Sequence, residues 1–116
     1  MRSGLIEHLQ DLFSEFGAVS ARPMFGGHGV YRDEVLIGIV LDETLYLKVD
    51  AQTRPAFEAA GCIPCVYTRQ RTPITMSYWT VPEAAMDSAQ AMLPWAQLAH
   101  GAALRKTKSA RARSRN

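Results

Sequence analysis

The stretch Val35-Leu36-Ile37-Gly38-Ile39-Val40-Leu41 decides the fold of this chain. It is apolar throughout and rich in β-branched residues, which is typical of a strand inside a sheet. Asp42 and Glu43 follow as a turn pair, and residues 44–49 then alternate between apolar and polar side chains. A short turn between two such runs forces antiparallel pairing. The sequence therefore predicts an antiparallel hairpin near the centre of the chain.

Helical spacing of apolar residues and turn-forming residues predict the elements on either side of this hairpin. In order, we expect a helix over 4–16, a glycine-rich bend over 20–29 leading into a strand that ends at Arg32, strands over 35–41 and 44–49, a short helix ending at Gly61, strands over 63–69 and 73–81, a helical turn at 83–86, and a last helix capped by Asp87 and kinked or restarted at Pro94. The predicted order is α-β-β-β-α-β-β-α.

This order predicts an α+β fold, a two-layer sandwich with a five-stranded, mainly antiparallel sheet and helices on one face. Strict alternation along the central strand would place Val35, Ile37, Ile39 and Leu41 on one face and Leu36 and Val40 on the other. Both faces of that strand are therefore apolar. Either the second face of the sheet is a protein contact, such as a homodimer interface, or the last helix or a terminal segment covers it.

Length and composition indicate one soluble globular domain over residues 1–104. The chain has 116 residues, of which 47% are hydrophobic, and it lacks both a signal-peptide pattern and an apolar run of about 18 residues that could span a membrane. Two cysteines are too few for a disulfide scaffold, so we expect a cytoplasmic protein.

Charge is distributed unevenly along the chain. Residues 1–104 contain seven basic and eleven acidic residues and so carry −4, whereas residues 105–116 carry +6. We expect this tail to be disordered, because it lacks large apolar residues. It is either a weak arm for nucleic acid or a solubilising segment. Its candidate nucleic-acid contacts are Arg105, Lys106, Lys108, Arg111, Arg113 and Arg115.

Motifs that could carry chemistry are weak. Cys62-Ile63-Pro64-Cys65 follows a helix-ending glycine and enters a strand, which favours buried thiols over a redox site. Gly26-Gly27-His28-Gly29 precedes a strand and lacks the lysine of a phosphate-binding loop, so a glycine bend is favoured over an anion site. We predict no catalytic residues, no metal ligands and no cofactor. An anion site would need the fold to gather scattered cations, namely Arg22, Lys48, Arg54, Arg69 and Arg71.

Several motifs in combination resemble the N-terminal domain of the TfoX/Sxy family. They are Arg22-Pro23-Met24-Phe25-Gly26-Gly27-His28-Gly29-Val30-Tyr31, Leu45-Tyr46-Leu47-Lys48-Val49-Asp50, Phe57-Glu58-Ala59-Ala60-Gly61, Met76-Ser77-Tyr78-Trp79 and Leu93-Pro94-Trp95-Ala96. The resemblance covers about residues 10–100 and implies the element order given above. It also implies a bacterial regulator of natural competence, a transcriptional coactivator whose partner is the cyclic-AMP receptor protein. Full-length regulators of this type carry a second, helical domain, whereas here a basic tail follows Leu104.

Two classes of function remain open. In the first, the chain is a non-enzymatic regulatory domain that contacts a protein partner, with weak DNA affinity from the tail. In the second, it is a protein-interaction or small-ligand module with no role in transcription. An enzyme is a third, more distant reading, because no convergent set of acids and bases is evident. The candidate partner contacts on the sheet and the glycine bend are Arg22, Met24, His28, Tyr46 and Lys48.

Overall fold

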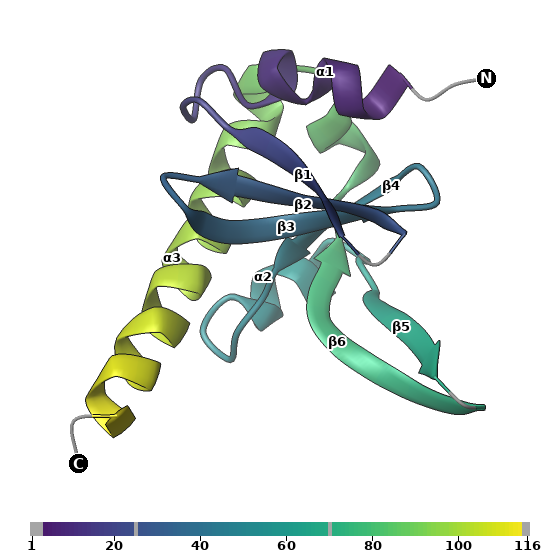
Figure 1. Cartoon of the computed structure of the whole chain (residues 1–116). Coiled ribbons are helices and arrows are strands. Elements are labelled where there is room, and N and C mark those ends of the chain that lie inside the picture. Colours follow the sequence, from purple (N-terminus) through teal and green to yellow (C-terminus); the bar gives the residue numbers. More distant parts are fainter. Residues whose placement is uncertain (1–3, 25, 70, 115–116) are drawn as a thin grey trace.

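The computed structural model describes residues 4–24, 26–69 and 71–114 and shows an α+β fold (Figure 1). The elements are α1 (Gly4–Leu12), β1 (Ser20–Met24), β2 (Gly27–Arg32), β3 (Val35–Leu41), β4 (Thr44–Lys48), α2 (Arg54–Ala59), β5 (Pro64–Arg69), β6 (Thr72–Thr80), a 3-10 turn η1 (Glu83–Met86) and α3 (Ala89–Ser114). The predicted fold class is confirmed.

The sheet contains six strands rather than the five expected. Its order is β1-β2-β3-β4-β6-β5, and every neighbouring pair is antiparallel. The additional strand, β1, occupies the segment expected as a bend. Pro23 lies in it and pairs with His28. Proline is tolerated there because β1 is an edge strand and needs hydrogen bonds on one side only.

Two tight turns set the register of the central hairpins, as predicted. Asp33 and Glu34 between β2 and β3, and Asp42 and Glu43 between β3 and β4, all have positive φ angles, from 49° to 67°. Two consecutive residues in this conformation form the turn whose twist matches that of antiparallel strands. The side chains of each central pair are exposed, so the turns do not disturb the core.

A β-bulge changes which face each residue of β3 occupies. Tyr31 pairs with Leu36 and Val30 pairs with Gly38, which leaves Ile37 as the extra residue. Ile37 and Val40 therefore both belong to the hydrophobic core, whereas Ile39 pairs with Tyr46 on the opposite face. The expected grouping of Ile37 with Ile39 is wrong, because an extra residue reverses the alternation beyond it.

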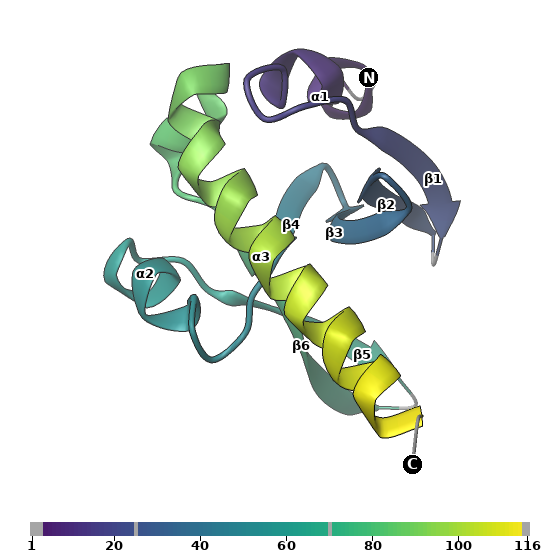
Figure 2. The ribbon, with the colours of Figure 1, turned by 90° about the vertical axis from the view of Figure 1, so that its left-hand side faces the viewer.

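The helices and the sheet enclose one core. Leu9, Leu12 and Phe13 from the N-terminal segment, Phe57 from α2 and Met92 from α3 are all buried in the same cluster as the inward residues of the sheet. α3 packs on β3 and β4, and Figure 2 shows it crossing in front of the sheet. The Phe57 and Trp95 rings meet edge to face at 4.9 Å, which joins α2 to α3.

α3 is longer than the sequence predicts. Ser88 rather than Asp87 begins it, since the Ser88 hydroxyl accepts a hydrogen bond from the Ala91 amide at 3.1 Å. The helix continues through Pro94 and ends at Ser114. Residues 105–114, expected to be disordered, are therefore helical in the structure. Alanine, arginine and lysine are strong helix formers, and a tail that continues an existing helix needs no new nucleus. The expected boundary at residue 104 lies inside one continuous helix.

None of the helices within the described residues is long and apolar enough to cross a membrane.

Candidate functional site

A hollow of about 460 Å³ lies where β4 ends, between the loop that follows it, β6 and α3. Its lining includes three cations, Lys48, Arg105 and Lys106, and one carboxylate, Asp50. Lys48 comes from β4 and Ser77 from β6, whereas Arg105 and Lys106 lie on the part of α3 that was expected to be disordered. The fold thus gathers charged groups that are up to 58 residues apart in the chain.

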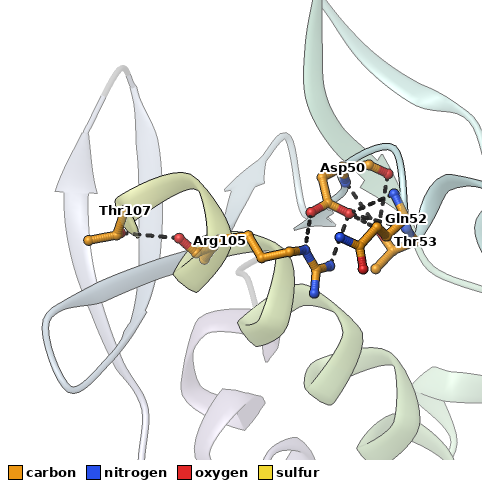
Figure 3. A network of polar contacts seen from close by, with 6 residues as sticks. Asp50, Gln52, Thr53, Arg105 and Thr107 are labelled. Atoms are coloured by element: carbon orange, nitrogen blue, oxygen red, sulfur yellow. Dashed lines mark hydrogen bonds and ion pairs between the residues drawn. The ribbon is translucent and has the colours of Figure 1, made fainter. Parts of the chain in front are cut away.

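Asp50 organises one side of the hollow. Its carboxylate accepts two hydrogen bonds from Arg105, from Nε at 2.6 Å and from Nη2 at 3.0 Å (Figure 3). The same carboxylate accepts the backbone amides of Gln52 and Thr53, each at 3.1 Å. These donors, Arg105 first among them, lower the pKa of Asp50. Asp50 is therefore an ionised carboxylate whose acceptor capacity is used within the chain.

Lys48 is the unusual group at this site, because only 5% of its surface is exposed. Its ammonium donates a hydrogen bond to the Ser77 hydroxyl at 2.6 Å and lies 5.0 Å from the centre of the Tyr78 ring. Burial lowers the pKa of Lys48, and the positive charge of Lys106 lowers it further, while Asp50 opposes both effects. Among the described residues, no carboxylate forms an ion pair with Lys48.

A second hollow adjoins the first and shares Ser77 and residues 49–51 with it. Arg54, Met76 and Trp79 line its far side. Arg54 is already paired with Glu58, one helical turn away, at 2.8 Å, and its guanidinium lies 5.7 Å from the Trp79 ring. The cationic character of the site is therefore concentrated beside Lys48.

The candidate contacts on β1 lie elsewhere. Arg22 stacks on the Tyr31 ring at 4.3 Å and pairs with Glu34 at 2.8 Å. Gly29 lies beneath the side chains of Met24, Tyr31 and Leu36. A Cβ at this position would collide with Met24 and would lie only 3.0 Å from Tyr31 and from Leu36. This half-exposed group, which we call the outer patch, is defined by Arg22, Met24, Tyr31 and Leu36.

His28 lies on the other face of the sheet from the outer patch, whereas Tyr46 shares its face, because Tyr46 pairs with Ile39 and Ile39 pairs with Gly29. His28 pairs with Val40, a core residue, so it lies on the helix-facing side of the sheet. Tyr46 is half-buried opposite Ile39, and its hydroxyl lies close to the Cys65 thiol. Burial raises the pKa of both groups; the contact adds to the rise in the pKa of Tyr46 and opposes the rise in the pKa of Cys65. The structure therefore places Arg22, Met24 and Tyr46 on the outer face of the sheet, His28 on the helix-facing side and Lys48 in the hollow.

Both cysteines are free and buried, as predicted. Burial raises the pKa of Cys62 and of Cys65, which opposes thiolate formation. No group of three or more metal-ligating side chains occurs within the part of the chain that the structure describes.

The six candidate nucleic-acid contacts have different environments. Arg105 is engaged with Asp50, while Lys106 and Lys108 are exposed on α3. Arg111 and Arg113 belong to the same helix, and Arg115 lies outside the described residues.

The sequence offered Lys48 for an anion site only if the fold gathered it with Arg22, Arg54, Arg69 and Arg71. Arg22 is on the outer patch, and Arg71 lies at the turn between β5 and β6. The neighbours of Lys48 in the structure, Lys106 and Arg105, were expected in a disordered tail as candidate nucleic-acid contacts. The available signal was the spacing of Ala99, Ala102, Ala103 and Lys106, which places them along one side of a helix.

Comparison with known proteins identifies the chain's relatives. The model of the TfoX N-terminal domain matches residues 11–103. A curated protein from Aliivibrio fischeri (strain ATCC 700601 / ES114), named DNA transformation protein TfoX1, is 29% identical over 82 residues. This match covers 67% of the present chain and 39% of the relative. Since the family model spans most of the chain and every element from the end of α1 to the buried part of α3, the chain belongs to the TfoX N-terminal domain family.

Proposed function

We propose that this chain is a non-enzymatic regulatory domain of DNA transformation, which acts by contacting other macromolecules. The family and the name of the relative support the link to transformation. The observation that carries the proposal is the basic end of α3, which continues as a helix after its last described buried residue, Ala103. Residues 105–114 include five basic residues and no acidic one.

The basic end of α3 suits a contact with the DNA backbone. It extends for about 16 Å beyond Ala103, at the helical rise per residue. A helix with exposed cations attracts phosphates without reading the base sequence. Arg105 is held by Asp50, which leaves Lys106, Lys108, Arg111, Arg113 and Arg115 as the proposed DNA contacts.

Salt dependence tests this part of the proposal. Five phosphate contacts predict a slope of about −4.5 for log affinity against log salt on duplex DNA. A variant with glutamine at the five proposed contacts, and with Arg105 retained, should lose most of the slope and most of the affinity. Arg22→Gln is the control, because Arg22 lies on the outer patch. If the five-glutamine variant binds as tightly as the parent, α3 is not the DNA contact.

The protein partner is proposed to be a transcription factor such as the cyclic-AMP receptor protein, which the resemblance implies. The outer patch is the proposed contact, because it combines an arginine stacked on tyrosine with half-exposed apolar side chains, a composition common in protein interfaces. Binding of the purified receptor to the chain should weaken in Met24→Ser and persist in Leu104→Ser, an exposed position on α3. Equal binding by both variants would exclude the outer patch.

The hollow beside Lys48 favours a second candidate, a small-ligand module with no role in transcription. A chain that binds neither the receptor nor DNA, but does bind a small anion, would support this alternative.

A further inference from the structure

Lys48 is a buried charged residue that forms no ion pair within the described residues, and burying such a charge costs free energy. Only 5% of its surface is exposed, yet the carboxylate nearest to it in the chain, Asp50, is committed to Arg105 and to two backbone amides. An ammonium has three donors, and the structure shows one hydrogen bond from Lys48, to Ser77. Buried charges normally have a partner of opposite sign, because desolvation is otherwise uncompensated.

A second cation faces the same space. Lys106 lines the hollow and acts on Lys48 as a like charge. Arg105 also lines it, and neither of its two hydrogen bonds to Asp50 uses Nη1. The two lysines, one of them buried, thus line the same hollow as Ser77, and the carboxylate in that lining, Asp50, is engaged by Arg105.

We propose that Lys48, Ser77 and Lys106 form a binding site for a phosphate group carrying two negative charges, as in inorganic phosphate or a phosphate monoester. Two ammonium groups match that charge, and lysine binds phosphate as a point charge. The Ser77 hydroxyl can rotate to donate to a phosphate oxygen while it accepts the hydrogen bond from Lys48. A hollow of about 460 Å³ has room for a phosphate and a small attached group.

A monoester fits the site better than a phosphate within a DNA strand. Lys48 is 5% exposed and reached through the hollow, whereas a phosphodiester carries one charge and must continue in both directions along the chain. The site therefore shares Lys106 with the proposed DNA contact but not Lys48, and Lys48 should contribute nothing to the salt dependence of DNA binding.

Titration calorimetry on the full chain at constant ionic strength tests the site, with inorganic phosphate as one probe and a nucleoside 5′-monophosphate as the other. Lys48-dependent binding of either probe, in the millimolar range or tighter, is the expected result. The tighter probe identifies the source of the phosphate. Lys48→Met should weaken binding by about 10- to 100-fold, the loss of one charged hydrogen bond. Lys108→Gln, on the same helix outside the hollow lining, is the control.

Thermal unfolding provides a second measurement that separates ligand binding from a structural role. Without phosphate, Lys48→Met should be as stable as the parent or more so, because it removes a buried charge that lacks a counterion. With phosphate, the parent should gain stability and Lys48→Met should not. Lys106→Gln, at an exposed position, should also lose the gain. Absence of any phosphate effect on the parent, or a gain in Lys48→Met and Lys106→Gln as large as that of the parent, would overturn the site without bearing on the other DNA contacts.

Discussion

Arg105 and Asp50 form a two-point ion pair, with Nε of Arg105 2.6 Å from Oδ2 of Asp50 and Nη2 3.0 Å from Oδ1. The pair joins α3 to the loop between β4 and α2, 55 residues earlier in the chain. Because the carboxylate also accepts two amides of that loop, one side chain holds both the loop and the helix. This pair fixes the place where Lys106 approaches Lys48.

Removing this pair should cost stability in a pH-dependent way. Arg105→Gln should destabilise the chain by about 1 kcal/mol at neutral pH, a modest value because both side chains remain partly exposed. Arg105 lowers the pKa of Asp50, so the stabilisation is fully present above the unfolded-state pKa. It is lost as pH falls through the lower, folded-state pKa.

Urea unfolding from pH 7 down to pH 2 would measure this effect. The difference between parent and Arg105→Gln should shrink below about pH 4, where the carboxylate of the unfolded chain protonates. Lys108→Gln should follow the parent across the range. A difference that stayed constant with pH would mean that Asp50 is not the partner of Arg105 in solution.

Replacing each of two glycines with alanine should change the stability of the chain in opposite directions. A Cβ at Gly38 in β3 would lie 2.7 Å from the Tyr46 carbonyl oxygen, a backbone atom that cannot move without disturbing the β3–β4 pair. Gly38→Ala should therefore destabilise by about 2 kcal/mol or more, as overpacking does. Gly101 in α3 meets nothing closer than 3.4 Å, and Gly101→Ala should stabilise by about 0.5–1 kcal/mol. Denaturant midpoints of the two variants would compare them directly.

Phe57 anchors α2 to the core. Its side chain is fully buried and touches the Trp95 ring. Phe57→Ala should cost about 3–5 kcal/mol, the range for truncating a buried aromatic residue. Val66→Ala, at a position that is 54% exposed on β5, should change stability by less than about 0.5 kcal/mol. Equal losses in the two variants, measured by thermal unfolding, would contradict the position of α2.

The two thiols should react slowly in the native state. Cys62 and Cys65 are 8% and 4% exposed, and burial raises the pKa of each. Both should be protected from a thiol reagent at pH 7.5 and should react together when the chain is unfolded. Mass spectrometry of labelled protein would count the modified thiols over time. Rapid labelling of either cysteine before unfolding would show that its thiol is accessible.

Local patterns in the sequence predicted most of the elements correctly. The apolar run of β3, the alternation in β4 and the paired acidic turns specify an antiparallel hairpin through short-range preferences alone. The fold class followed from the order of the elements. β1 was missed because Pro23 and the glycines nearby disfavour a strand locally, whereas pairing with β2 stabilises one at the edge.

Contacts between distant residues determined the rest. The bulge at Ile37 arises from pairing between β2 and β3, and it exchanged the faces of Ile39 and Val40. The path of α3 beyond residue 104, where Arg105 meets Asp50, brought Lys106 to Lys48. Sequence alone determined the hairpins, the fold class and the family resemblance, because each depends on neighbouring residues or on motifs in order. Only the tertiary structure decided that a buried lysine, a serine and a helix-borne lysine meet, because that meeting depends on how α3 crosses the sheet.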